Sequence, residues 1–240
     1  MSESIYIVMP AYNESENIGL VVAQWHKVVE NIGNNSRLLI VDDSSKDDTL
    51  KILLELMKEY PLLEVLTKAN SGHGITCLFA YQYAISKNPE WIFQTDSDGQ
   101  TDPNDFWQFW QKRQEYDFLI GLRNNRLDGV NRIFVTRVLK FILFLIFQVN
   151  VPDANTPFRL IRGKTLIKYL EIIPSDSFLS NVIMSTLIVK DKLPYLWLPI
   201  QFKPRQGGIN SIDFKKIVKI GFKAINDFIK IKRNYLKLKK

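Results

Sequence analysis

Apolar and polar positions follow two different periods along the first hundred residues of the chain. Short runs that are apolar at almost every position are typical of strands buried on both faces of a sheet. Between them lie longer stretches whose apolar positions recur every three or four residues, as on one face of a helix. The runs predict strands at 5–9, 37–41, 63–66 and 91–94, and the stretches predict helices at 17–32, near 47–57 and at 74–86.

Strand and helix therefore alternate in units of about 30 residues, which form right-handed crossovers and a mainly parallel sheet flanked by helices. The predicted fold class is α/β. The second half is less regular, with helices predicted at 105–115, 133–149, near 164–170 and at 180–189, and strands at 118–121, 158–161 and 195–202. No repeat or linker divides the chain, so we expect one domain over residues 1–211 and a helical tail over 212–240.

Polar side chains gather directly after three of the predicted strands. Residues 10–14 follow the first strand, Asp42 and Asp43 follow the second, and residues 96–100 follow the fourth. Ligands of open parallel sheets bind at the carboxyl ends of the strands. We therefore expect the three clusters to share one active site.

The acidic segment Asp96-Ser97-Asp98-Gly99-Gln100 is the strongest chemical signal of the three. Asp96, Asp98 and Gln100 alternate, so their side chains point the same way if the segment stays extended. Two carboxylates and an amide oxygen are hard ligands for Mg²⁺ or Mn²⁺, and substrate phosphate oxygens can complete the shell. The same residue types also form acidic turns, so a metal site and a plain loop both fit the segment taken alone.

Composition is that of an ordinary globular protein. The chain has 240 residues, 46% apolar and 24% charged, which is enough apolar mass for a real core. Cys77 is the single cysteine, which excludes an internal disulfide and fits a reducing compartment. The sequence shows neither a signal-peptide pattern nor an apolar run of about 20 residues. We therefore expect a cytoplasmic protein.

The net charge of +7 is concentrated in the last part of the chain. Residues 203–240 contain twelve Lys or Arg and two Asp, a balance of +10, so the rest of the chain carries about −3. Lysines interleave with apolar residues over 212–232, and a basic amphipathic helix is typical of a membrane-surface element. A helix packed on the domain is the alternative. The very apolar helix at 133–149, with Val138, Phe141 and Leu145 on one face, is expected to lie in the core.

Four segments occur in the order and spacing of one enzyme family. They are Pro10-Ala11-Tyr12-Asn13-Glu14, Val41-Asp42-Asp43-Ser44-Ser45 with Asp48-Thr49, Asn70-Ser71-Gly72-His73-Gly74, and the acidic segment. The chain resembles family 2 glycosyltransferases over residues 5–211, which implies the GT-A fold, with a nucleotide-binding half at 1–100 and an acceptor half at 101–211. Within that family it is similar to dolichol-phosphate mannosyltransferase and the bacterial polyprenyl-phosphate branch. That likeness rests on the Asp-x-Asp-x-Gln form, the loop 153–159 and the segment 205–211.

The resemblance implies a role for each strand-end residue. Three residues would line the nucleoside pocket, namely Pro10, Tyr12 and Glu14. Asp42 and Asp43 would accept hydrogen bonds from the base or the ribose. Gly72 and Gly74 would let the backbone approach the nucleotide, and His73 would contact phosphate. Helix capping, plain turns and a solvated loop histidine are the alternatives for these positions.

Arginines form a second set, because a guanidinium group donates two hydrogen bonds at once to phosphate oxygens. The set is Arg123, Arg126, Arg132, Arg159 and Arg205. Of these, Arg159 and Arg205 are the favoured contacts to the donor diphosphate or to a phosphate-bearing acceptor. Asp153 is the candidate base by position if the acceptor is a hydroxyl. The Glu-Asp pair that often supplies the base in relatives is not apparent in this sequence, which favours a phosphate acceptor.

These residues together predict a metal-dependent glycosyltransferase, and the resemblance implies that it inverts the anomeric carbon. The metal and the arginines would neutralise the diphosphate leaving group as its bond to the sugar C1 breaks. The donor would be a UDP- or GDP-sugar. The acceptor would be polyprenyl phosphate or a lipid-linked glycan in surface polysaccharide or glycolipid assembly, at the inner face of the membrane.

Two other classes compete with this interpretation. A nucleotidyltransferase also uses carboxylate-bound metal on an α/β sheet, but it needs a glycine-rich basic loop after the first strand. Residues 10–14 contain neither a glycine nor a cation. A nucleic-acid-binding protein would fit the net charge of +7, but the basic residues lie on an apolar-faced helix without a nucleic-acid motif, so no nucleic acid partner is expected.

Overall fold

A computed structural model describes residues 3–123, 130–203 and 214–239, with the backbone alone at 130–134, 214–220, 222 and 238. Its centre is a seven-stranded sheet in the order β3-β2-β1-β4-β6-β5-β7. The strands are β1 Ile5–Ala11, β2 Arg37–Asp42, β3 Leu63–Thr67, β4 Trp91–Gln94, β5 Phe118–Arg123, β6 Arg159–Arg162 and β7 Tyr195–Ile200. Only β6 runs against its neighbours. The predicted mainly parallel sheet is confirmed.

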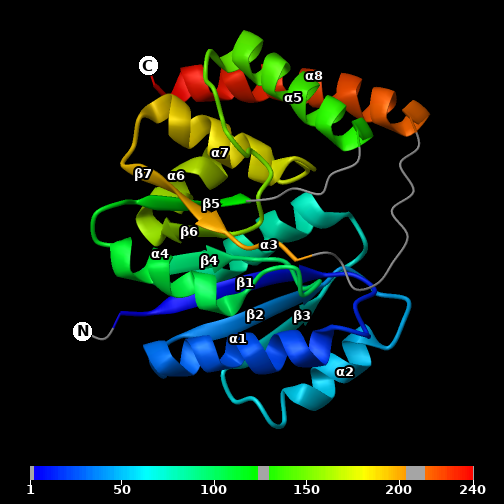
Figure 1. Cartoon of the computed structure of the whole chain (residues 1–240), viewed down its shortest axis with the longest axis vertical. Helices are drawn as coiled ribbons and strands as arrows, with labels where there is room; N and C mark the ends of the chain where they lie inside the picture. The colour runs from blue at the N-terminus through cyan, green and yellow to red at the C-terminus, as the bar shows by residue number, and fades with distance from the viewer. Residues whose placement is uncertain (1–2, 124–129, 204–213, 240) are drawn as a thin grey trace.

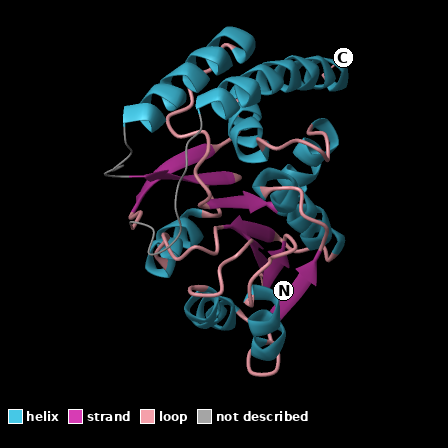
Figure 2. Ribbon diagram, turned by 90° about the vertical axis from the view of Figure 1, so that its right-hand side faces the viewer, coloured by secondary structure: helices cyan, strands magenta, loops and turns pink. Residues whose placement is uncertain are grey.

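Helices cover both faces of this sheet, as Figures 1 and 2 show. One face carries α1 Ile18–Ile32, α2 Thr49–Leu56 and α4 Phe106–Lys112, the last preceded by a short 3-10 helix, η1 Pro103–Asp105. The other carries α3 His73–Ser86, α6 Gly163–Ile172 and α7 Ser180–Asp191. Outside that second layer lie α5 Val130–Phe147 and α8 Phe214–Leu238, side by side.

The strand β1 shows why the apolar runs of the sequence are continuous. Ile5 and Ile7 pack into the core under α1, whereas Tyr6 and Val8 pack into the core under α3, so both faces are buried. The sequence predicted that β1 stops before Pro10, but it continues to Ala11. Proline removes only a backbone donor, and the Pro10 carbonyl still accepts a hydrogen bond from Ser97 Oγ at 2.8 Å.

The C-terminal helix α8 is packed on the globule. Ala224, Phe228 and Ile231 are buried, and the Phe228 ring lies 6.2 Å from that of Phe147 on α5. Asp191 at the end of α7 accepts hydrogen bonds from the Tyr235 hydroxyl and from Lys239 Nζ. Asp191 also accepts from Tyr169, at 2.9 Å. The domain division at residue 211 stays a prediction, but α8 contributes to the same apolar core as α3 and α7.

The helix α5 corrects one prediction of the sequence. Its most apolar face was expected in the core, but Phe141 is 62% exposed and Leu145 55%. The core takes Leu143 and Phe147 instead. The sequence of α5 is apolar on opposite sides of the helix, so the pattern could not say which side is buried. Among the described residues, no helix combines the length and apolarity required to span a bilayer.

Candidate active site

A cavity of about 380 Å³ opens at the carboxyl ends of β1, β2 and β4. Because these strands are parallel neighbours, the polar residues that follow them meet at one edge of the sheet. The prediction that the three clusters converge is therefore confirmed. The lining consists of Pro10, Ala11, Tyr12, Glu14, Asp43, Asn70, Gly72, His73, Thr76, Asp96, Ser97 and Asp98.

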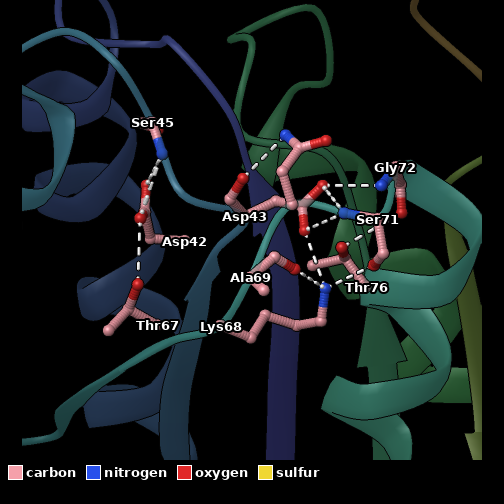
Figure 3. Close-up of polar contacts among 10 residues, drawn as sticks. Asp42, Asp43, Ser45, Thr67, Lys68, Ala69, Ser71, Gly72 and Thr76 are labelled. Atoms are coloured by element: carbon pink, nitrogen blue, oxygen red, sulfur yellow. Dashed lines mark hydrogen bonds and ion pairs between the residues drawn. The ribbon is translucent and has the colours of Figure 1, made fainter.

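Asp43 is held rigidly at one side of this cavity. One carboxylate oxygen accepts a hydrogen bond from Lys68 Nζ at 2.8 Å, and the other accepts from the Gly72 amide at 2.8 Å (Figure 3). The Ser71 amide also donates to it, at 3.0 Å. Burial opposes ionisation, but the hydrogen bonds from Lys68, Gly72 and Ser71 outweigh burial and lower the pKa of Asp43. Asp43 is thus a fixed carboxylate at neutral pH.

Asp42 has a different role from its neighbour, although the sequence predicted the same one. Successive side chains of a strand point to opposite faces, and Figure 3 shows Asp42 turned away from Asp43. Its carboxylate is buried and accepts from the Ser45 amide at 3.2 Å and from Thr67 Oγ1 at 3.2 Å. Asp42 does not line the cavity. It closes the turn after β2, as the alternative of a plain turn predicted.

The acidic segment lies across the cavity from this network, but it is not extended. Gly99 has φ +71°, a backbone conformation that favours glycine, so the segment turns after Asp98. Asp96 and Asp98 line the cavity, whereas the Gln100 side chain donates to the Lys203 carbonyl at 2.8 Å. The expectation that all three side chains share one direction is therefore wrong for Gln100.

Asp96 and Asp98 fit a hard divalent cation such as Mg²⁺ or Mn²⁺. Both are carboxylates at the wall of a cavity large enough for a ligand, and a cation held there would need further oxygens from that ligand. No group of three or more His, Cys, Asp or Glu able to hold a metal occurs among the described residues. The donor set therefore suits a metal that is shared with a phosphate-bearing substrate rather than a closed structural site.

His73 begins α3 and contacts the acidic segment. Its Nε2 lies 2.8 Å from an Asp96 carboxylate oxygen, and its Nδ1 lies 3.8 Å from the buried Cys77 sulfur. The Cys77 sulfur and the Asp96 carboxylate raise the pKa of His73 well above its usual value. The contact of His73 with phosphate stays a prediction, since its ring bonds Asp96 here.

The two glycines beside His73 serve different purposes. Gly72 lines the cavity with φ +90°, which allows its amide to turn toward Asp43. A Cβ at Gly74 would lie 2.1 Å from the Phe178 carbonyl oxygen. The close approach at Gly74 is therefore to the chain before α7, and the approach to a nucleotide that the resemblance implied stays a prediction.

The first strand supplies the remaining predicted wall of the cavity. Pro10, Tyr12 and Glu14 all line it. The Tyr12 ring is 40% exposed, so one face is available for stacking. The Glu14 carboxylate accepts from Asn17 Nδ2 at 3.2 Å, and its amide donates to Thr49 Oγ1 at 2.8 Å. The predicted nucleoside-binding residues are thus together, and their contact with a nucleoside stays a prediction.

Arg123 was predicted to bind phosphate and Asp153 to act as the general base, but these two side chains are paired with each other. Arg123 donates two hydrogen bonds to the Asp153 carboxylate, both at 2.8 Å, and both side chains are almost buried. The Arg123 guanidinium also lies 5.1 Å from the centre of the Phe202 ring. Neither Arg123 nor Asp153 lines the cavity. Their predicted roles as phosphate ligand and general base do not match this arrangement.

Arg159 is enclosed as well, although it was predicted to contact a diphosphate. It is 0% exposed, and its guanidinium donates to the backbone carbonyls of Thr156 and Asn181, the latter at 3.1 Å. Burial lowers the pKa of Arg159. The sequence could not distinguish a buried arginine from a substrate-binding one, because either can stand where a loop meets a strand, as Arg159 does at the start of β6. Arg126 and Arg205 lie outside the described residues, and only the backbone of Arg132 is described.

Three residues of the site were not singled out by the sequence. Asn70 and Thr76 line the cavity, and Lys68 neutralises Asp43. Lys68 directly follows β3, so a cation after the third strand was the available signal. Asn70 fixes the same loop, since its side chain donates to the Asp43 carbonyl at 2.8 Å.

Comparisons with known proteins identify the family and the fold of the chain. A family model described as glycosyl transferase family 2 matches residues 6–170. The undecaprenyl-phosphate 4-deoxy-4-formamido-L-arabinose transferase of Pectobacterium carotovorum subsp. carotovorum (strain PC1) is 20% identical over 221 residues, which are 91% of this chain. The chain spans 65% of the length of that relative.

Two solved structures are similar in fold. Glucosyl-3-phosphoglycerate synthase from Mycobacterium tuberculosis, crystallised with Mn²⁺, uridine-diphosphate and phosphoglyceric acid, has a TM-score of 0.70 at 13% identity, covering 96% of this chain and 78% of that one. S. aureus TarS has a TM-score of 0.57 at 18% identity, covering 83% of this chain and 60% of that one. The fold predicted from the four segments is confirmed as GT-A. Since the family model matches well over half of the chain, the protein belongs to glycosyl transferase family 2.

Proposed function

We propose that this protein transfers a sugar from a UDP- or GDP-sugar to polyprenyl phosphate or to a lipid-linked glycan, with Mg²⁺ or Mn²⁺ and with inversion at the anomeric carbon. It would act at the inner face of the membrane, in surface polysaccharide or glycolipid assembly. Family membership argues against the nucleotidyltransferase and nucleic-acid-binding alternatives.

One observation carries the donor half of this proposal. Asp43 and the pair Asp96 and Asp98 line the same cavity. A fixed carboxylate accepts hydrogen bonds from the N–H or O–H groups of a nucleoside, whereas paired carboxylates hold a cation against its diphosphate. A ligand that carries a nucleoside and a diphosphate together would satisfy both ends of this cavity.

The residues of the chain then account for bond breaking by charge. An acceptor oxygen attacks the sugar C1, and the electron pair of the C1–O bond leaves with the nucleoside diphosphate. A divalent cation held by Asp96 and Asp98 would supply positive charge to that leaving group. Asp43 and Tyr12 would hold the nucleoside so that the diphosphate lies at the acidic pair.

The state of Asp153 supports a phosphate as the acceptor. A hydroxyl acceptor needs a base that takes its proton, whereas a phosphate is already an anion. Both oxygens of Asp153 accept hydrogen bonds from Arg123, and the carboxylate is 5% exposed, which is a poor setting for a base. An undecaprenyl-phosphate acceptor is also named for the relative from Pectobacterium carotovorum.

The donor is tested with a panel of UDP- and GDP-sugars, each with Mg²⁺, with Mn²⁺ and with excess EDTA. We expect either the UDP-sugars or the GDP-sugars to raise the melting temperature when metal is present. We also expect the protein to hydrolyse the matching nucleotide-sugar slowly. EDTA should abolish both effects. If no UDP- or GDP-sugar gives a metal-dependent response, the proposed donor is wrong.

The acceptor is tested by product chemistry. With radiolabelled donor, polyprenyl phosphate should give a lipid product that releases its sugar in mild acid, because a sugar phosphodiester is labile there. A product that resists mild acid and forms only with a glycan acceptor would show that the acceptor is a hydroxyl. Donor hydrolysis without acceptor separates a wrong acceptor from an inactive preparation.

A further inference from the structure

Large apolar side chains stand exposed along the outer face of α5. Val138, Phe141, Phe144 and Leu145 are 40%, 62%, 50% and 55% exposed. Their spacing places all four on the side of the helix opposite Leu143 and Phe147, which pack in the core. Single exposed apolar residues are common, but four on two helical turns form a patch that marks a contact surface.

The neighbouring helix α8 adds positive charge to the same side of the molecule. Its sequence contains eight Lys or Arg and one Asp. Lys230, Arg233 and Lys237 are exposed, and their spacing places them together on the side away from the buried Phe228. Figures 1 and 2 show α5 and α8 side by side as the outermost layer, so an apolar row lies beside a basic one.

The chain topology connects this layer to the cavity. The parallel strands β5 and β7 end at the same edge of the sheet as β1 and β4, where the cavity opens. The next helix after β5 is α5, and the next after β7 is α8. Figure 1 shows that both outer helices begin on the side of the molecule where β1 ends, and the cavity opens at that end of β1.

We propose that the outer face of α5 together with Lys230, Arg233 and Lys237 of α8 is a docking surface for an anionic lipid bilayer. The apolar row would enter the boundary between headgroups and acyl chains, and the cations would contact lipid phosphates. A second copy of the chain is a poorer occupant, because a symmetric contact through this layer would bring two basic rows together. The relevance of this surface to catalysis rests on the proposed lipid acceptor.

The docking surface is tested by sedimentation of the full chain with lipid vesicles, in the absence of nucleotide. Vesicles of phosphatidylcholine mixed with phosphatidylglycerol should bind the protein, and vesicles of phosphatidylcholine alone should bind it more weakly. The double variant Phe141→Ser, Phe144→Ser should lower the partition coefficient at least about tenfold, since burial of one phenylalanine is worth about that much. Lys230→Glu with Lys237→Glu should remove the preference for the anionic vesicles and its dependence on salt.

Matched controls exist on the opposite face of the sheet. Leu20 on α1 is 62% exposed and Leu54 on α2 is 50% exposed, as are Phe141 and Phe144. The variant Leu20→Ser, Leu54→Ser should bind vesicles like the wild type. A polarity-sensitive dye on Phe141→Cys should shift to the blue with anionic vesicles, and the same dye on Leu20→Cys should not. The native Cys77 is buried and does not compete for the label.

Three results would overturn the proposal. The first is that the wild-type chain binds neither kind of vesicle. The second is that the double variant Phe141→Ser, Phe144→Ser binds vesicles like the wild type. The third is that the wild type is a dimer and this double variant is a monomer. The last would make the layer an interface between two copies. Hydrolysis of the nucleotide-sugar needs no vesicle. A protein that binds vesicles but does not hydrolyse the donor would therefore contradict the proposed reaction and not the docking surface.

Discussion

The carboxylates of the two halves of the sheet stand in different surroundings. In the first half, Asp43, Asp96 and Asp98 follow strands β2 and β4 and face a common cavity. In the second half, Asp153 is paired with Arg123, and Asp191 accepts from two tyrosines and a lysine. The first set lines a cavity that we propose binds the donor, whereas the second set bonds other groups of the protein. Substitution should therefore affect activity in one half and stability in the other.

The largest expected effect sharpens this contrast at Asp98. Asp98→Asn removes one of the two proposed cation ligands, so metal-dependent hydrolysis of the nucleotide-sugar should fall at least about 100-fold. The melting temperature should change by less than about 2 °C, since Asp98 lies at the cavity wall. The exposed Glu115→Gln should leave both quantities unchanged. Full activity of Asp98→Asn would remove this residue from the metal site.

Asp153→Asn should give the opposite result, with a loss of stability. The substitution leaves the nearly buried Arg123 cation without its carboxylate, at a cost of about 3 kcal/mol in the free energy of unfolding. Replacing both partners, as Arg123→Met with Asp153→Leu, should recover stability to within about 1 kcal/mol of the wild type. Chemical denaturation measures both. The exposed pair Lys58 and Glu55 is the control, and Glu55→Gln should cost less than about 0.5 kcal/mol.

A different outcome at Asp153 would break the comparison. If Asp153→Asn leaves stability intact but abolishes transfer while sparing donor hydrolysis, the carboxylate acts on the acceptor. Asp153 would then be the base that the sequence suggested.

The smallest expected effect concerns Lys68, which holds Asp43. Lys68→Met removes the nearest cation, so the pKa of Asp43 should rise toward its ordinary value. The lowered pKa stabilises both folding and binding above the ordinary pKa of aspartate, and this contribution is lost as pH falls through the lowered value. In the variant the acid limb of donor binding should therefore move to higher pH. KM for the nucleotide-sugar should rise about tenfold with kcat little changed, and Lys58→Met should show neither effect.

The first half of the fold could be predicted from the sequence because each of its signals is local. Its strands are apolar on both faces, as Tyr6 and Ile7 show by packing into the two opposite cores. Its helices have one apolar side. The site residues follow strand ends, where the topology forces them together. What the sequence could not supply was the direction of individual side chains, as at Asp42, Gln100 and Gly74. Each of these depends on a turn or on a neighbour distant along the chain.

The second half was harder for a physical reason. Arg123, Asp153 and Arg159 have the residue types of a phosphate site, but they bond partners within the protein. A sequence shows a charge without showing what neutralises it. The same limit applies to α5, since an apolar face carries no record of whether another layer covers it. Antiparallel β6, which enters the sheet between β4 and β5, brought these groups together without a periodic signal.

The packing of α8 has a practical consequence for anyone who trims this protein for crystals or expression. A cut after residue 213 would look like the removal of a charged tail, but it would strip Phe228 from Phe147 and take Tyr235 and Lys239 from Asp191. The inner side of α5 would then be open together with its outer side, so the shortened chain should aggregate. Purification tags and truncations are better placed at the N-terminus.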